Sequence, residues 1–336
     1  MIKPAERPLP FSSLKPLIGG ALFGVLLRLV FHGDSGEAWS AMAGAFVFLV
    51  PLAVGAVTVF IAERTQRRSW GYYAYAGFLA NVMFVCGTLL IMIEGLICAI
   101  VILPLLGTIG MIGALVTGAV CRLAKWPKPI TYCIAALPLV VGGVEPVDHL
   151  PVRVQTIERT VEIAAPRSVV WAQLFDVHDI LPHEFEDSIA HRIGVPEPVA
   201  ARAEVGYPGV RRITMGKHVR FDQIELERRD FELIRWRQQF YPDSFPPNAF
   251  DQHVVMGGDY FDVEEVAYAL ANRGECTELT ARMRYRVSTR FNWYADAVAR
   301  IVLGNLENTL LGIYRTRAEA AIAQYEEGRS GLESSL

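Results

Sequence analysis

Residues that could act in catalysis lie in the polar second half of the chain. His218 and His253 are the candidates for a general base, and a histidine in that role needs a partner that orients it. The sequence pairs neither histidine with a carboxylate. Ser/His/Asp, Cys/His and glycine-rich phosphate-loop signatures do not occur. The two histidines therefore remain catalytic candidates without a recognisable mechanism, and whether the chain is an enzyme stays open.

Metal-ligand side chains gather around His178, His183 and Glu184. Their spacing matches no common ligand pattern for zinc. A short helix and loop in contact with solvent would have the same composition. We therefore expect neither a metal nor another cofactor.

Arginine and aromatic side chains are the candidates for binding a ligand. Arg235 and Arg237 alternate with Trp236, so the arginines share one face of a predicted strand and Trp236 lies on the other. If the arginine face lines a cavity, the ligand has an anionic head, because arginine binds carboxylate or phosphate through paired hydrogen bonds. If that face is the outer one, the arginines form an exposed row of charge. Five aromatic residues could line the cavity or pack the core: Trp171, Tyr260, Tyr285, Trp293 and Tyr294.

Alternating segments would position these residues. A strand that reaches Ile163 passes through Ala-Ala-Pro into a short helix containing Trp171, and a proline at the first helical turn loses no hydrogen bond. Further strands are predicted over residues 210–215, 219–226, 231–241, 259–270 and 277–288. In the strand 210–215, Arg211 shares a face with Ile213 and Met215.

A long amphipathic helix is predicted over residues 292–326. Its apolar stripe consists of Val298, Ile301, Val302, Leu306, Leu310, Ile313 and Tyr314. A curved antiparallel sheet wrapped around this helix would bury both apolar faces, which is an α+β helix-grip domain. We expect its first strand at an edge of the sheet and Trp171 facing the helix.

Four segments of the second half carry a resemblance to a known family: VEIAAPRSVVWAQLFD from Val161, GVRRITMGKHVRFDQIEL from Gly209, GGDYFDVEEVAYAL from Gly257 and LTARMRYRVSTRFNWYADAVARIVLGNLENTLLGIYRTRAEA from Leu279. Residues 152–326 resemble the START-like superfamily, also called SRPBCC, which includes polyketide cyclase/dehydrase-type and lipid-transfer domains. A smaller subgroup also carries a hydrophobic N-terminal region. The resemblance implies a cavity for an apolar ligand and does not imply one reaction.

The first half of the chain has the composition of membrane helices, which need about 20 apolar residues to cross a bilayer. Hydrophobic residues make up 52% of the chain and concentrate before residue 145. The first apolar run is followed by further long apolar runs, so we expect it to be the first span of a multi-pass protein and not a cleavable signal peptide. Five runs predict a transmembrane domain over residues 1–145: 14–31, 41–62, 72–93, 96–120 and 130–144. A linker over residues 146–151 and a flexible tail over residues 327–336 flank the polar domain.

The distribution of positive charge predicts an orientation, because cytoplasmic loops are enriched in Lys and Arg. The positive residues occupy the N-terminal tail and alternate loops: Lys3, Arg7, Lys15, Arg64, Arg67, Arg68, Arg122, Lys125 and Lys128. The N-terminus is therefore expected in the cytoplasm of a bacterial inner membrane. If the fifth run spans, which we favour, the polar domain is periplasmic; if that run lies on the membrane surface, the domain is cytoplasmic.

Charge and cysteine content restrict the partners. The net charge is -3, so nucleic-acid binding is not expected. The five cysteines form no disulfide framework and no CxxC metal pattern. We expect membrane lipids and a hydrophobic small molecule such as a lipid, sterol or polyketide as partners. The alternatives are a cyclase, dehydratase or hydrolase acting on a membrane-derived substrate, and a scaffold that binds a protein.

Overall fold

The computed structural model describes residues 14–33, 39–123, 127–146, 150–185, 187–204, 209–247 and 249–333. The chain forms two compact units, Met1–Leu150 and Pro151–Leu336. Each unit has its own buried apolar cluster.

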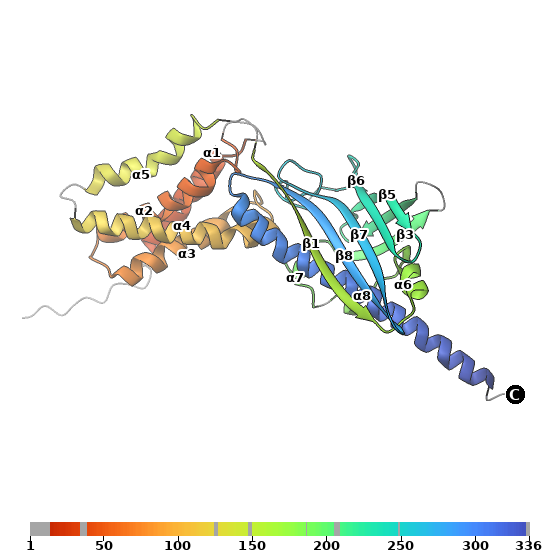
Figure 1. Cartoon of the computed structure of the whole chain (residues 1–336). Coiled ribbons are helices and arrows are strands. Elements are labelled where there is room, and N and C mark those ends of the chain that lie inside the picture. The colour runs from red at the N-terminus through yellow and green to blue at the C-terminus, as the bar shows by residue number, and fades with distance from the viewer. Residues whose placement is uncertain are drawn as a thin grey trace, which may run out of the picture. The chain divides into compact units, whose positions relative to one another are not determined.

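Helices form the first unit (Figure 1). Three stretches are long and apolar enough to cross a membrane: Ala45–Glu63, Trp70–Leu90 and Leu96–Leu123. These findings indicate a membrane protein. The helices in chain order are α1 (Lys15–Val30), the π-helical stretch η2 (Ala45–Leu49) that continues into α2 (Val50–Glu63), α3 (Trp70–Leu90), α4 (Leu96–Leu123) and α5 (Pro127–Gly142).

Close backbone packing holds α2 against α4. A Cβ atom on Gly55 would lie 2.0 Å from the carbonyl oxygen of Gly110, so only glycine allows this approach. Small residues at helix contacts are typical of membrane bundles. Glu94 lies in the turn between α3 and α4 and forms an ion pair with Arg28 of α1 at 2.6 Å. Each of these two largely buried charges is therefore compensated by the other.

An antiparallel sheet of eight strands forms the second unit, in the order β1-β8-β7-β6-β5-β4-β3-β2. The strand β1 lies at one edge, as predicted, and pairs with β8 from Val152 opposite Ser288 to Ile163 opposite Thr277. The strands are β1 (Val152–Ile163), β2 (Asp176–Val177), β3 (Pro198–Glu204), β4 (Val210–Met215), β5 (Arg220–Arg229), β6 (Leu233–Gln239), β7 (Phe261–Arg273) and β8 (Cys276–Ser288).

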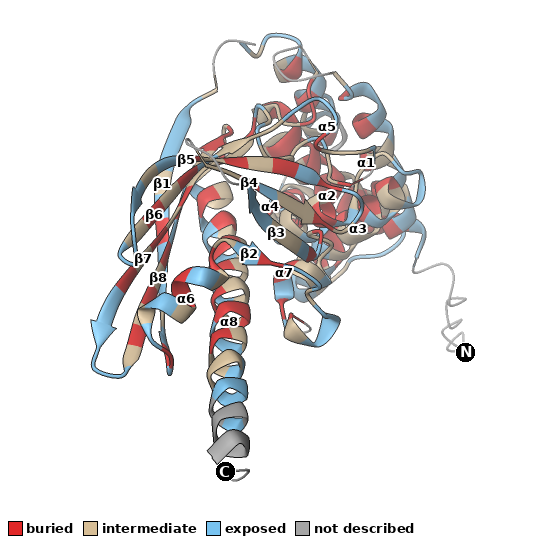
Figure 2. Cartoon of the chain, turned by 90° about the vertical axis from the view of Figure 1, so that its right-hand side faces the viewer, coloured by how far each residue is buried: buried red, intermediate tan, exposed pale blue. Residues whose placement is uncertain are grey.

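The sheet is curled and wraps the long helix α8 (Asn292–Glu333), which lies along its concave side (Figures 1 and 2). Register shifts in β5 and β7 supply local bends of the kind that β-bulges produce. Three short helical pieces lie between β1 and β3: α6 (Arg167–Gln173), η3 (Pro182–Glu184) and α7 (Ile189–Arg192). The described unit is therefore a helix-grip domain, as predicted.

The predicted stripe of α8 is buried at Ile313 and Tyr314, with Leu306 and Leu310 packed against the core, but it is displaced near its start. Ile301 is 67% exposed, whereas Ala299, Leu303 and Leu311 are buried against the sheet. These buried residues are spaced by four or eight, and the position that completes their row is Glu307. The helix also continues to Glu333, beyond residue 326 where the periodic pattern ends.

Candidate functional site

A buried polar cluster lies between the sheet and α8. Alternation turns Arg211 of β4, Gln223 of β5, Trp236 of β6 and Tyr268 of β7 to the side on which the core lies, and α8 contributes Tyr314. Each of these residues is less than 10% exposed. Four adjacent strands thus bring polar atoms to one region of an otherwise apolar interior.

Arg211 is at the centre of this cluster and is 3% exposed. Its Nη1 donates to Gln223 Oε1 at 3.0 Å, and its Nη2 donates to the Tyr314 hydroxyl at 2.8 Å. The guanidinium carbon lies 4.9 Å from the centroid of the Trp236 ring, within the range of a cation–π interaction. Its Nε has no hydrogen-bond partner in the described part of the chain.

Two tyrosines continue the cluster. The rings of Tyr268 and Tyr314 meet edge to face with centroids 5.6 Å apart, and Tyr268 also contacts Trp236 at 5.9 Å. Burial raises the pKa of Tyr268 well above its usual range, and the neighbouring Tyr314 hydroxyl raises it further. The Tyr268 phenol is therefore protonated at neutral pH and can donate a hydrogen bond.

Glu307 is the second unusual group of this interior. The residue is fully buried, and among the described residues neither carboxylate oxygen has a partner with normal hydrogen-bond geometry. Burial raises the pKa of Glu307 to about 8, although the Arg159 guanidinium and the Met283 backbone favour the ionised form. The Glu307 carboxyl is thus mainly neutral at pH 7 and can donate or accept a proton.

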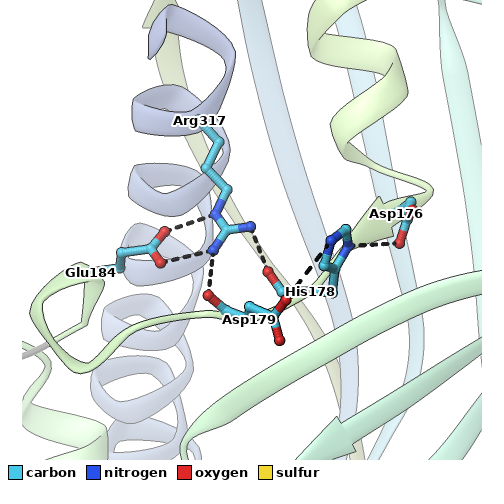
Figure 3. Close-up of polar contacts among 5 residues, drawn as sticks. All are labelled: Asp176, His178, Asp179, Glu184 and Arg317. Atoms are coloured by element: carbon cyan, nitrogen blue, oxygen red, sulfur yellow. Dashed lines mark hydrogen bonds and ion pairs between the residues drawn. The ribbon is translucent and has the colours of Figure 1, made fainter. Parts of the chain in front are cut away.

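A clasp of polar contacts fastens the segment after β2 to α8 (Figure 3). Arg317 of α8 donates from Nε and Nη2 to the two carboxylate oxygens of Glu184, both at 2.8 Å. It also donates to the carbonyl oxygens of His178 at 2.7 Å and Asp179 at 3.0 Å. The hydrogen bonds from Arg317 are the largest cause that lowers the pKa of Glu184.

The clasp includes His178 and Glu184, two of the residues that were considered as metal ligands from the sequence. Glu184 is held by Arg317, and the His178 ring lies 3.3 Å from Asp176 at the surface. Within the described residues, no three His, Cys, Asp or Glu side chains come together as a metal ion would require.

The two predicted arginines lie on the outer face of β6. The Arg235 side chain is 43% exposed and 3.5 Å from Glu227, while Arg237 is exposed. The inner face is that of Ile234 and Trp236, which are buried. The arginine face of this strand could line a cavity or lie on the outside of the sheet, and the structure shows it on the outside.

The predicted aromatic residues separate into two groups. Trp171, Tyr260 and Tyr285 are buried, whereas Trp293 is 61% exposed and packs against Tyr294. The Trp171 ring contacts Phe175 and Phe231, although its helix α6 packs on α8. The Tyr285 hydroxyl donates to Asp296 at 2.7 Å, and this bond contributes to raising the pKa of Tyr285 above its usual range, with burial as the larger cause.

The candidate general bases lie in different surroundings. His218 is exposed in the turn after β4, where its φ is 59°. His253 lies in the segment between β6 and β7 with its ring 5.7 Å from that of Tyr260. No ion pair with a carboxylate involves His218 in the described part of the chain.

Sequence reasoning missed Arg211 and Glu307 as site residues. A signal for Arg211 existed, because it alternates in phase with Ile213 and Met215, which face inward. The signal for Glu307 is the row of residues four apart along α8 from Ala299 through Leu303 to Leu311.

The order of elements defines the class of this unit: a curled antiparallel sheet, short helices after the first strand, and a long C-terminal helix inside the curl. This is a helix-grip fold, and in the sequence it follows a unit that contains three helices long and apolar enough to span a membrane. The sequence matches no protein-family model and no curated protein.

Solved structures similar to this unit include a START superfamily protein from Mycobacterium smegmatis, with 17% identity, 51% of this chain and 98% of that chain covered, and a TM-score of 0.30. A truncated norcoclaurine synthase from Thalictrum flavum has 13% identity, 50% and 96% coverage, and a TM-score of 0.30. A protein of unknown function from Staphylococcus aureus has 14% identity, 51% and 98% coverage, and a TM-score of 0.33. At such values the likenesses say nothing about activity.

Proposed function

We propose that this protein is anchored in a membrane by its N-terminal helices and binds or transfers a hydrophobic ligand between the sheet and α8. The observation that supports this best is the polar cluster inside the apolar interior. Arg211 Nε and both Glu307 oxygens are buried without a regular partner among the described residues, and a buried unpaired group costs about 1–3 kcal/mol. An amphipathic ligand such as a lipid, sterol or polyketide would bring partners for these groups and apolar surface for the rest.

Anchoring gives this binding a physical logic. Apolar molecules concentrate in the bilayer, so a tethered domain meets them at high local concentration. The distribution of Lys and Arg supports a bacterial inner membrane with the N-terminus in the cytoplasm and the helix-grip domain in the periplasm. Trp171, Tyr260 and Tyr285 are the buried aromatic residues that we propose to contact the ligand.

An enzyme acting on a membrane-derived substrate is the second candidate, and one observation favours it. The pKa of Glu307 lies at about 8, near neutral pH, as efficient general acids and bases require. The Tyr268 phenol, which stays protonated, would be a hydrogen-bond donor to the substrate and not the acid. In this alternative Glu307, and not His218 or His253, would transfer the proton.

Carry-over of ligand tests the proposal. The full chain is moved from its host membrane into nanodiscs of perdeuterated phosphatidylcholine, and organic extracts are analysed by mass spectrometry. Residues 1–150 alone, treated in the same way, report molecules held by the helices. We expect an undeuterated apolar compound with the full chain at near-equimolar amount and little with residues 1–150. If both samples retain equal amounts of the undeuterated compound and no apolar compound raises the melting temperature of the full chain, ligand binding is excluded. The remaining alternative is then a scaffold that binds a protein.

A further inference from the structure

We propose that Arg211 forms a subsite for an anionic head group, a carboxylate or a phosphate, at the inner end of the ligand. This inference rests on the proposed function and adds the chemical class of the ligand. It concerns a residue on β4, on the concave side of the sheet, and not the exposed arginines of β6.

Two other arginines of the described residues are neutralised by a carboxylate: Arg28, which is buried, and Arg317, whose side chain is 24% exposed. Arg28 pairs with Glu94 at 2.6 Å, and Arg317 pairs with Glu184 at 2.8 Å. Arg211 is more deeply buried than Arg317, yet the ion pairs of the described residues include none with Arg211. Its hydrogen-bond partners, an amide oxygen and a phenol, are neutral.

Two inward carboxyl groups could in principle supply the missing charge. Glu225, two positions along β5 from Gln223, is buried, but it is not within ion-pair distance of Arg211. Glu307 is held mainly as the neutral acid at pH 7, so it contributes little negative charge. The positive charge of Arg211 is therefore left for an anion from outside the chain, since an uncompensated buried charge is strongly unfavourable.

The donors of the cluster suit an anionic head. The Arg211 Nε–H has no partner in the described structure and is the donor left for the ligand, because the protonated hydroxyl of Tyr268 already interacts with that of Tyr314. Trp236 covers one face of the guanidinium, and the unpaired Nε–H lies in the guanidinium plane. An oxyanion in that plane can accept from the guanidinium with the strength of a charge-assisted hydrogen bond.

The test compares head groups on one alkyl chain. The full protein in phosphatidylcholine nanodiscs is labelled by a palmitic acid analogue with a diazirine in mid-chain, and crosslinked peptides of β4 to β7 and α8 are quantified. Unlabelled palmitate, hexadecyl phosphate and 1-hexadecanol compete. We expect palmitate, hexadecyl phosphate or both to displace the probe at concentrations about 10-fold or more below that of hexadecanol, as charge-assisted bonds predict. The stronger of the two anions identifies the head group.

Variants of two neighbouring arginines on β4 distinguish a specific subsite at Arg211 from a general effect of positive charge. Arg212→Gln is the matched control, because Arg212 lies on the outer face of β4 and pairs with Glu204 at 3.2 Å. Arg211→Gln should abolish the preference for the anion while leaving displacement by hexadecanol unchanged, and Arg212→Gln should keep the preference. Arg211→Lys retains the positive charge and should keep part of the preference for the anion. This variant gives a result even if Arg211→Gln fails to fold.

Each outcome has a distinct meaning. Displacement by hexadecanol at the same concentration as by the anions would overturn the anion subsite and leave ligand binding standing. An unchanged preference in Arg211→Gln would also overturn it. If the wild type gives no crosslinks in these peptides, the proposed function and the subsite both fail.

Discussion

Glu307→Gln removes a carboxyl that the interior keeps protonated at neutral pH, and it should make the stability of the helix-grip unit less sensitive to a rise in pH from 5 to 8. In the unfolded chain this carboxyl has its ordinary pKa of 4.5, and in the folded unit burial raises the pKa to about 8. The folded state therefore holds the proton more tightly. Stability from this residue is fully present below pH 4.5 and is lost as the pH rises toward 8.

The size of the effect follows from the two pKa values. The difference between 4.5 and about 8 corresponds to at most about 5 kcal/mol, most of it lost between pH 5 and pH 8. Typical domains are stable by about 5–15 kcal/mol, so a loss of this size would be easy to detect. Glutamine has nearly the same shape and stays neutral, so the variant should show no such loss.

Urea unfolding of the full chain in a non-ionic detergent, at pH values from 5 to 9, measures this difference. Brief proteolysis at each urea concentration removes unfolded molecules, and mass spectrometry counts surviving peptides from residues 151–336. Glu232→Gln is the control, because Glu232 is exposed in the turn before β6 and 3.7 Å from Arg229. Parallel pH profiles for the wild type and Glu307→Gln would refute the claim that the interior holds Glu307 neutral.

Three further predictions follow from other parts of the chain. Arg317→Gln should raise the hydrogen-exchange rate of residues 178–185 about 10-fold or more, because four hydrogen bonds from Arg317 hold this segment, and the exposed control Arg315→Gln should not. In the wild type the protection that Glu184 contributes should decrease as the pH falls, because the folded state lowers the pKa of Glu184. Gly55→Leu should abolish most of the monodisperse full chain in size-exclusion chromatography, because its Cβ would overlap the Gly110 carbonyl, whereas Gly71→Leu has room and should be tolerated. An alkaline phosphatase fused after Leu336 should be active if the helix-grip domain is periplasmic; activity only of a cytoplasmic reporter would contradict five spans.

Strands with strict alternation could be predicted closely from the sequence. Residues 277–288 alternate throughout, and the observed strand is Cys276–Ser288. The strand Pro198–Glu204 was missed because its sequence, PVAARAE, is rich in alanine and has little β-branched or aromatic content. The sheet as a whole was predictable because its concave face must be apolar, whereas a short strand held mainly by its neighbour leaves little pattern.

The candidate site was less predictable, because it depends on residues that break the pattern. Glu307 lies in the buried row of α8, where a charged residue reads as surface, so the predicted stripe was displaced to include the exposed Ile301. Arg211 was on the correct face by alternation, but an arginine in a strand is far more often solvated. Only the tertiary contacts with Gln223 and Tyr314 distinguish it from Arg235 on the outer face.

The two unusual residues of the interior also constrain each other. A buried cation and a buried acid that paired directly would form a closed ion pair, and an apolar replacement of such a pair is often as stable. Here Arg211 bonds to neutral groups, while Glu307 remains a neutral acid up to about pH 8. The Arg211 guanidinium therefore has no ionised partner within ion-pair distance among the described residues. A cationic ligand would be repelled by it, and a neutral ligand would leave Arg211 uncompensated. An anion is the class of ligand that removes the cost of burying this charge.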